Sequence, residues 1–194
     1  MLARTESEAD TLTTERRNDR FLPDSPFPES LTVTSLLEIA LNKSDLVIIA
    51  VPSDCFRDNV RQIMPHLNPG TILLSATKGL ELPAAQRMSQ VMKDELPIGL
   101  HSGICVLSGP NLAKEIVYGK PASTVIASQN AASARKSQDT LMSANFRVYT
   151  STDMLGVELA GALKNVVALG AGIADGMEAG ENAKATVILS LIHI

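Results

Sequence analysis

The chain has 194 residues, of which 45% are hydrophobic and 20% are charged, a balance that is ordinary for one or two soluble globular domains. A net charge of −4 argues against nucleic acid as the main partner, because phosphate binding needs a basic surface. The longest apolar runs, such as residues 46–51, are far too short to span a bilayer, and no secretory signal is visible at the N-terminus. We therefore expect a cytoplasmic protein without stable membrane insertion.

Cysteine and histidine give no sign of a metal or redox site. Cys55 and Cys105 lie far apart in the sequence and outside any metal-binding or redox spacing, so we expect small core residues. His66, His101 and His193 are scattered, and none has a partner at helical spacing. We expect no metal.

The N-terminal segment divides into a charged part and a proline-rich part. Residues 1–20 are strongly charged and predict one exposed helix. In residues 21–30, Pro23, Pro26 and Pro28 forbid a helix and predict an ordered or extended loop.

From residue 44 the sequence alternates short apolar runs, typical of buried strands, with segments of helical periodicity. This alternation predicts a mostly parallel sheet with helices on both faces, the doubly wound or Rossmann-type α/β fold. We expect strands at residues 44–52, 71–79, 104–107, 123–127 and 146–149, and helices at 54–67, 83–96, 112–118 and 131–143. The apolar faces of the first two helices are predicted to be Phe56, Val60, Ile63 and Met64, and Met88, Val91 and Met92.

The pattern changes at Asp153, after which more than 30 residues rich in Ala, Gly and Leu contain no strand signal. This composition predicts a long buried helix, a break near residues 176–180 and a second helix. We place a domain boundary near residue 150. Residues 1–150 then form the nucleotide-binding domain, and residues 151–194 begin an all-helical second domain.

Two predicted strand ends carry residues suited to anion binding. Lys78 follows one strand in Ala-Thr-Lys-Gly, and Gly109 and Asn111 follow another in Ser-Gly-Pro-Asn. In doubly wound sheets ligands bind outside the carboxyl ends of the strands. A lysine and a helix start at that edge could hold a phosphate. Taken singly, a solvated loop lysine and an ordinary strand-to-helix turn explain these residues equally well or better.

Lys164 lies in the middle of the predicted long helix, among small apolar neighbours that include Ala160 and Gly161. Such a lysine either extends outward to solvent or lies partly desolvated in a cleft. A desolvated lysine can serve as a general base or acid, and Asn165 beside it could hydrogen-bond the same ligand. Together with Lys78 and Gly109, this pair suits an oxidoreductase acting on a small phosphorylated substrate. The glycine-rich turn G-x-G-x-x-G follows no predicted strand, so the predicted doubly wound sheet is incomplete.

The sequence resembles the bacterial NAD(P)+-dependent glycerol-3-phosphate dehydrogenases over nearly its whole length. The matching segments include LVIIAVPS, SATKGLE, LSGPNLAKEI, GKPAS, GVELAGALKN and ENAKA. The resemblance implies that Lys164 is the proton acceptor and that Arg4, Lys78 and Ala113 contact the cofactor. It also implies that Lys78, Gly109, Asn111 and Lys164 contact the substrate, and Asn165 is expected to do so from its place beside Lys164. Asn111 departs from the family, in which this position is usually Ser or Thr.

The implied reaction interconverts dihydroxyacetone phosphate and sn-glycerol 3-phosphate with NADPH or NADH, for glycerophospholipid synthesis. The family also has a preceding strand, Gly-rich turn and helix and a longer C-terminal part, so we expect a truncated, marginally stable chain that is inactive alone. The ending Leu191-Ile192-His193-Ile194 also departs from the family pattern. Two alternatives stay open: an inactive fragment, and a related dehydrogenase of the 6-phosphogluconate or hydroxyacyl-CoA type. The sequence does not decide between NADH and NADPH, or whether the chain forms a homodimer.

Overall fold

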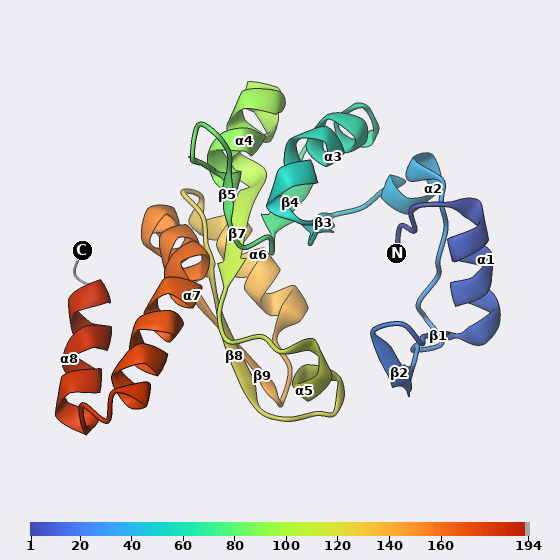
Figure 1. Cartoon of the computed structure of the whole chain (residues 1–194). Helices are drawn as coiled ribbons and strands as arrows, with labels where there is room; N and C mark the ends of the chain where they lie inside the picture. The colour runs from blue at the N-terminus through green and yellow to red at the C-terminus, as the bar shows by residue number, and fades with distance from the viewer. Residues whose placement is uncertain (193–194) are drawn as a thin grey trace.

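The computed structural model describes residues 1–192 and places a small N-terminal unit beside a larger α/β body (Figure 1). The unit contains helix α1 (Glu6–Glu15), the hairpin of β1 (Arg17–Asn18) and β2 (Leu22–Pro26), and α2 (Leu37–Leu41). Ala9 and Leu12 of α1 pack against Phe27 and Val33. The unit thus has its own small apolar core.

Two N-terminal expectations need correction. The helix predicted over residues 1–20 spans only Glu6–Glu15, because Arg16 adopts a left-handed conformation that ends it. The predicted loop at residues 21–30 contains the short strand β2, whose partner is β1. Prolines at the ends and edges of strands are compatible with pairing, since only one side of β2 needs to donate.

The body is built on a five-stranded sheet in the order β3-β4-β7-β8-β9. Three of its strand pairings are parallel, and only the β7–β8 pairing is antiparallel. The strands are β3 (Leu46–Ile49), β4 (Ile72–Ser75), β7 (Ile104–Ser108), β8 (Ala122–Ala127) and β9 (Phe146–Ser151). The parallel-dominated α/β sheet predicted from the sequence is confirmed.

Helices cover both faces of this sheet, as the alternating pattern predicts. On one face, α3 (Phe56–Ile63) and α4 (Met88–Glu95) bury the predicted apolar residues against Leu73 and Val106. On the other face, α6 (Ala131–Leu141) covers a second cluster that includes Leu74 and Cys105. Neighbouring residues of one strand therefore enter opposite cores, as expected for a sheet buried on both sides.

The antiparallel direction of β8 follows from the short connection before it. The only helix between β7 and β8 is α5 (Ala113–Val117), which is about 7.5 Å long and cannot carry the chain back across the sheet. The chain therefore turns back, and Ser108 pairs with Val125. As a result, the start of β8 lies beside the end of β7.

The helix predicted over residues 83–96 begins only at Met88. Before it, β5 (Leu80–Glu81) and β6 (Gln86–Arg87) form an antiparallel hairpin. Arg57 holds this hairpin to α3 and α4 through Glu81, Gln86 and Glu95. Residues 80–87 therefore form a hairpin with contacts to a distant part of the chain, although the local spacing of apolar residues predicts a helix from residue 83.

The helical end consists of α7 (Met154–Gly176) and α8 (Glu181–Ile192), which pack against each other. The predicted break and second helix are confirmed, but the expectation that the long helix is buried is wrong. Only Met154, Gly161 and Ala174 of α7 are buried, and Leu169 and Ile173 are exposed. By length and composition alone α7 could cross a membrane, with a mean hydropathy of 1.4, but the core helix of a soluble protein meets the same criterion. Residues 193–194 of the departing ending lie outside the described part of the chain.

Candidate functional site

Lys78 follows the carboxyl end of β4 in a turn that requires glycine. Thr77 Oγ1 donates to the carbonyl oxygen of Val51 at 2.7 Å and ties this turn to the segment after β3. Gly79 has φ of +146°, and a Cβ there would lie 2.9 Å from Ser53 Oγ. The turn therefore holds the base of Lys78 at the edge of the sheet where the sequence predicted it.

The structure brings Lys78 and Gly109 together. Lys78 Nζ donates a hydrogen bond to the carbonyl oxygen of Gly109 at 2.8 Å. A Cβ on Gly109 would lie 2.7 Å from the backbone oxygen of Ser123 and 2.9 Å from Thr124 Cα. Glycine is thus needed for the close approach of β8, and the carbonyl that receives Lys78 is fixed by that packing.

Asn111 lies nearby, but both ends of its amide already have partners. Its Nδ2 donates to the carbonyl oxygen of Ser123 at 3.1 Å, and its Oδ1 accepts from Thr124 Oγ1 at 3.1 Å. Thr124 is buried at the start of β8. The Asn111 side chain therefore stabilises the β7–β8 turn in this structure.

Helix α7 reaches the same edge at Gly161. A Cβ on Gly161 would lie 2.6 Å from Ser108 Oγ and 3.8 Å from Lys78 Cγ. Lys164 follows Gly161 by three residues on the same side of the helix. Its Nζ is exposed and donates to Asn165 Oδ1 at 2.7 Å. The Lys164 side chain therefore extends to solvent and is not desolvated in a cleft, which were the two predicted possibilities.

The positive charge of Lys164 acts on Lys78. The pKa of Lys78 is lowered below its ordinary value of 10.5, first by burial against its surroundings and second by the positive charge of Lys164. Two ammonium groups that repel each other at an open edge make a favourable place for a doubly charged anion. A phosphate ester is such an anion.

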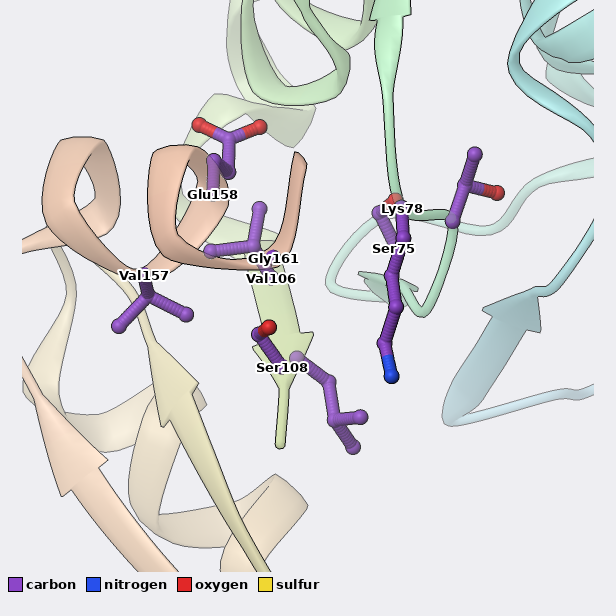
Figure 2. Close-up of a pocket in the computed structure, with 9 residues that line it drawn as sticks. Ser75, Lys78, Val106, Ser108, Val157, Glu158 and Gly161 are labelled. Atoms are coloured by element: carbon purple, nitrogen blue, oxygen red, sulfur yellow. The ribbon is translucent and has the colours of Figure 1, made fainter. Parts of the chain in front are cut away.

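A small pocket of about 10 Å³ lies beneath this edge, between β4, β7 and α7 (Figure 2). It is lined by Ser75, Thr77, Lys78, Val106, Leu107, Ser108, Val157, Glu158 and Gly161. This volume is about that of one water molecule. A phosphorylated substrate would therefore lie outside the pocket, on the open side where Lys78 and Lys164 face solvent.

Two predicted cofactor residues lie away from the lysines. Arg4 belongs to the N-terminal unit, which lies on the opposite side of β3 from α7 (Figure 1). Its backbone nitrogen donates to Glu8 Oε2 at 2.9 Å. Ala113 begins α5 and is exposed. An extended dinucleotide could contact such separated points, whereas a small substrate could not.

Glu158 is the residue that the sequence reasoning missed. Its side chain is only 8% exposed, and it accepts hydrogen bonds from Arg87 and Ser89. A signal was available, since it is an acidic residue in an apolar helix within the same motif as Lys164. Within residues 1–192, no group of three His, Cys, Asp or Glu side chains could hold a metal ion.

Comparison with known proteins identifies the family. Residues 1–134 match the model for the NAD-dependent glycerol-3-phosphate dehydrogenase N-terminus, and residues 153–193 match the model for its C-terminus. The chain belongs to the NAD-dependent glycerol-3-phosphate dehydrogenase family. The resemblance seen in the sequence is therefore confirmed.

The relatives that match are about twice as long as this chain. The glycerol-3-phosphate dehydrogenase [NAD(P)+] of Dehalococcoides mccartyi is 50% identical over 187 residues, which cover 96% of this chain and 52% of that protein. The enzyme of the same name from Chlorobium limicola is 41% identical, over 93% of this chain and 54% of its own length. The chain thus spans about half the length of the curated relatives it matches.

Solved structures agree with this assignment. The crystal structure of glycerol-3-phosphate dehydrogenase from Coxiella burnetii matches with a TM-score of 0.82 and 33% identity, over 97% of this chain and 57% of that one. A ketopantoate reductase from Ralstonia eutropha matches with a TM-score of 0.53 and 16% identity, and this likeness concerns the fold alone. The close structural neighbours are glycerol-3-phosphate dehydrogenases with the Rossmann-type fold.

Proposed function

We propose that this chain carries the substrate-binding edge of an NAD(P)-dependent glycerol-3-phosphate dehydrogenase, which interconverts dihydroxyacetone phosphate and sn-glycerol 3-phosphate. The observation that carries the proposal is the meeting of Lys78 from the end of β4 with α7, which bears Lys164. Both lysines face open solvent at the sheet edge where doubly wound proteins bind ligands.

The residues present fit one end of a nicotinamide dinucleotide better than the other. Lys78 provides a cation at the substrate edge, and Ala113, away from the lysines, provides a small exposed surface. The pyrophosphate end calls for a glycine-rich turn after a strand, and the sequence has no G-x-G-x-x-G. When bound, NADH or NADPH supplies the hydride for the substrate carbonyl carbon.

The two lysines have separate tasks in this proposal. Lys78, held by the Gly109 carbonyl, places positive charge where the phosphate and the C2 oxygen of the substrate lie. Lys164 gives a proton to the C2 oxygen during reduction and takes it back during oxidation. Asn165, which already accepts a hydrogen bond from Lys164, orients that ammonium group. Gly109 lies against the substrate through its backbone, whereas Asn111 acts by holding the turn.

The proposed domain boundary lies near residue 150, between residues 1–150 and residues 151–194. It is supported by the two family models, which end at residue 134 and begin at residue 153. We propose a cytoplasmic enzyme whose small-molecule partners are dihydroxyacetone phosphate, sn-glycerol 3-phosphate and the cofactor. A homodimer is compatible with the exposed apolar side of α7, and nucleic acid is not expected as a partner.

The proposal is tested by turnover of a chain completed to the length of its relatives. The segments that this chain lacks relative to the Dehalococcoides enzyme would be joined to residues 1–188, and oxidation of NADPH and NADH would be followed. We expect dihydroxyacetone phosphate to support oxidation, whereas acetoacetyl-coenzyme A and glycolaldehyde should not. Equal or better turnover of an acyl thioester would favour the alternative dehydrogenase class. Turnover by the completed chain but not by this chain would support the hypothesis that this chain is an inactive fragment.

A further inference from the structure

Glu158 joins the helical end of the chain to the α/β body through a buried carboxylate. Its Oε2 accepts from Arg87 Nη1 and from Ser89 Oγ, both at 2.6 Å, and its Oε1 accepts from the Ser89 backbone nitrogen at 2.7 Å. Figure 2 shows its carboxyl group directed away from Lys78. Both oxygens are therefore occupied, and neither is directed to the substrate edge.

The partners of Glu158 lie at the start of α4. Ser89 is the second residue of that helix, where backbone N–H groups have no partner within the helix. A carboxylate is the favoured acceptor there, because the helix start carries a partial positive charge. Arg87 adds a full positive charge directly before the helix. A buried carboxylate at this place is thus stabilised on three sides and fixes the position of the α7 backbone.

Glu158, Gly161 and Lys164 follow one another at intervals of three residues, so each is adjacent to the next on the surface of α7, while Glu158 and Lys164 point about 120° apart around the helix axis. The first is bound to α4, and the second lies against Ser108 at the end of β7. The third carries the ammonium group whose positive charge lowers the pKa of Lys78. Two fixed points along a stiff helix determine where the third residue lies.

We infer that Glu158 is a positioning residue, which binds α7 to α4 and thereby sets how closely Lys164 approaches Lys78. The inference rests on the proposed function, because it assigns Glu158 a role in the geometry of the two lysines. Without this contact, α7 would be held to the body by the packing around Gly161 and by Met154 and Val157 in the core, and Lys164 would be free to move away from Lys78.

The experiment measures the titration of Lys78 in this chain and needs no turnover. Lysine side chains are methylated with ¹³C formaldehyde, and the Lys78 signal is assigned with Lys78→Arg and followed by NMR from pH 7 to 12. In the unchanged chain Lys78 should titrate below the exposed lysines. Glu158→Gln keeps the side-chain shape and removes the charge, and Glu158→Ala removes the contact entirely.

The direction of the change separates positioning from a direct charge effect. If α7 withdraws, Lys78 loses both its burial and the repulsion by Lys164, so its pKa rises in both Glu158 variants. If Glu158 acted on Lys78 only through its negative charge, removing that charge would lower the pKa. A lowered or unchanged Lys78 pKa in a folded Glu158→Gln chain would overturn the inference. Glu38→Gln, an exposed carboxylate on α2, is the matched control and should change nothing.

Two further variants distinguish a failure of the Glu158 inference from a failure of the proposed pairing of Lys78 with Lys164. Lys164→Ala should itself raise the Lys78 pKa with Glu158 intact, and adding Glu158→Gln to it should raise the pKa less than Glu158→Gln does alone. If Lys164→Ala leaves Lys78 unchanged, the lysine pairing behind the proposed function fails, independently of Glu158. Should Glu158→Ala not fold by circular dichroism, Glu158→Gln, which keeps nearly the same side-chain volume, decides the question.

Discussion

Replacing Gly109 by alanine tests whether close packing of β7 and β8 holds the substrate edge together. The new methyl group would lie 2.7 Å from the Ser123 backbone oxygen and 2.9 Å from Thr124 Cα. Carbon atoms prefer separations of about 3.5–4.0 Å, and both contacts involve backbone that cannot rotate away. The two strand ends must therefore move apart, and the carbonyl that accepts from Lys78 moves with them.

The expected change in the free energy of unfolding is the sum of two opposing effects. Overpacking of a well-packed site costs about 1–3 kcal/mol. Alanine also restricts the unfolded chain more than glycine does, which returns about 0.4–1 kcal/mol. We expect Gly109→Ala to lower the free energy of unfolding by about 1–2 kcal/mol, or the Tm by about 2–8 °C in a chain of this size.

Thermal unfolding followed by circular dichroism measures this change. The matched control is Gly99→Ala, because a Cβ on the exposed Gly99 would have no neighbour within 4 Å. The control should leave the Tm unchanged or raise it slightly. An equal or smaller loss of stability in Gly109→Ala than in Gly99→Ala would refute the packing argument. The variant should also change the Lys78 titration, whereas the control should not.

Further predictions concern the ion pairs and the long helix. Arg57→Met should lower the free energy of unfolding by about 1.5–3 kcal/mol in urea titrations, because the partly buried carboxylates of Glu81 and Glu95 lose their charged hydrogen bonds to this partner. Hydrogen bonds from Arg57 to Glu81, and from Arg61 and Arg57 to Glu95, lower the pKa of these carboxyl groups below 4.5, so the stability they add is present above that pH. This stability should be lost as the pH falls through the lowered pKa values. The free energy of unfolding of Arg57→Met should therefore depend less on pH in the acid range than that of the unchanged chain, and an equal dependence would contradict this. Gly172→Ala on the exposed side of α7 should add about 0.5–1 kcal/mol, since the new methyl group meets nothing within 4 Å; a loss of stability would show that α7 packs differently.

Much of the fold could be predicted because the sheet is buried on both faces. Ile72, Leu73 and Leu74 form a continuous apolar run, and the helical spacing of Phe56, Val60 and Ile63 marks a single buried face. Both signals are local and result directly from burial, so the sequence alone contains them.

Other features depend on contacts that a local pattern does not contain. The hairpin formed by β5 and β6 is bound by Arg57, more than 20 residues earlier in the chain, through Glu81 and Gln86. The exposure of α7 was not visible in its composition, since an Ala- and Leu-rich helix looks the same whether or not another element covers it.

The candidate site was predicted in part. Lys78 and Gly109 follow strand ends, and the rule that parallel strands end at one edge was enough to bring them together. The role of Asn111 could not be predicted, because its partners belong to β8 and depend on the antiparallel turn. The role of Glu158 was not predicted, because it depends on hydrogen bonds with Arg87 and Ser89, about 70 residues away in sequence.

In the proposed reaction, Lys164 transfers the proton at the edge formed with Lys78. The most direct test is turnover of dihydroxyacetone phosphate with NAD(P)H by the completed chain, compared with Lys164→Ala in the same chain. Lys136→Ala is the control, because that exposed lysine lies on α6 and pairs with Asp45. Loss of a general acid should lower kcat by about 10²–10⁴-fold in Lys164→Ala and leave Lys136→Ala unchanged. A Lys164→Ala enzyme within a few-fold of the unchanged one would contradict the account.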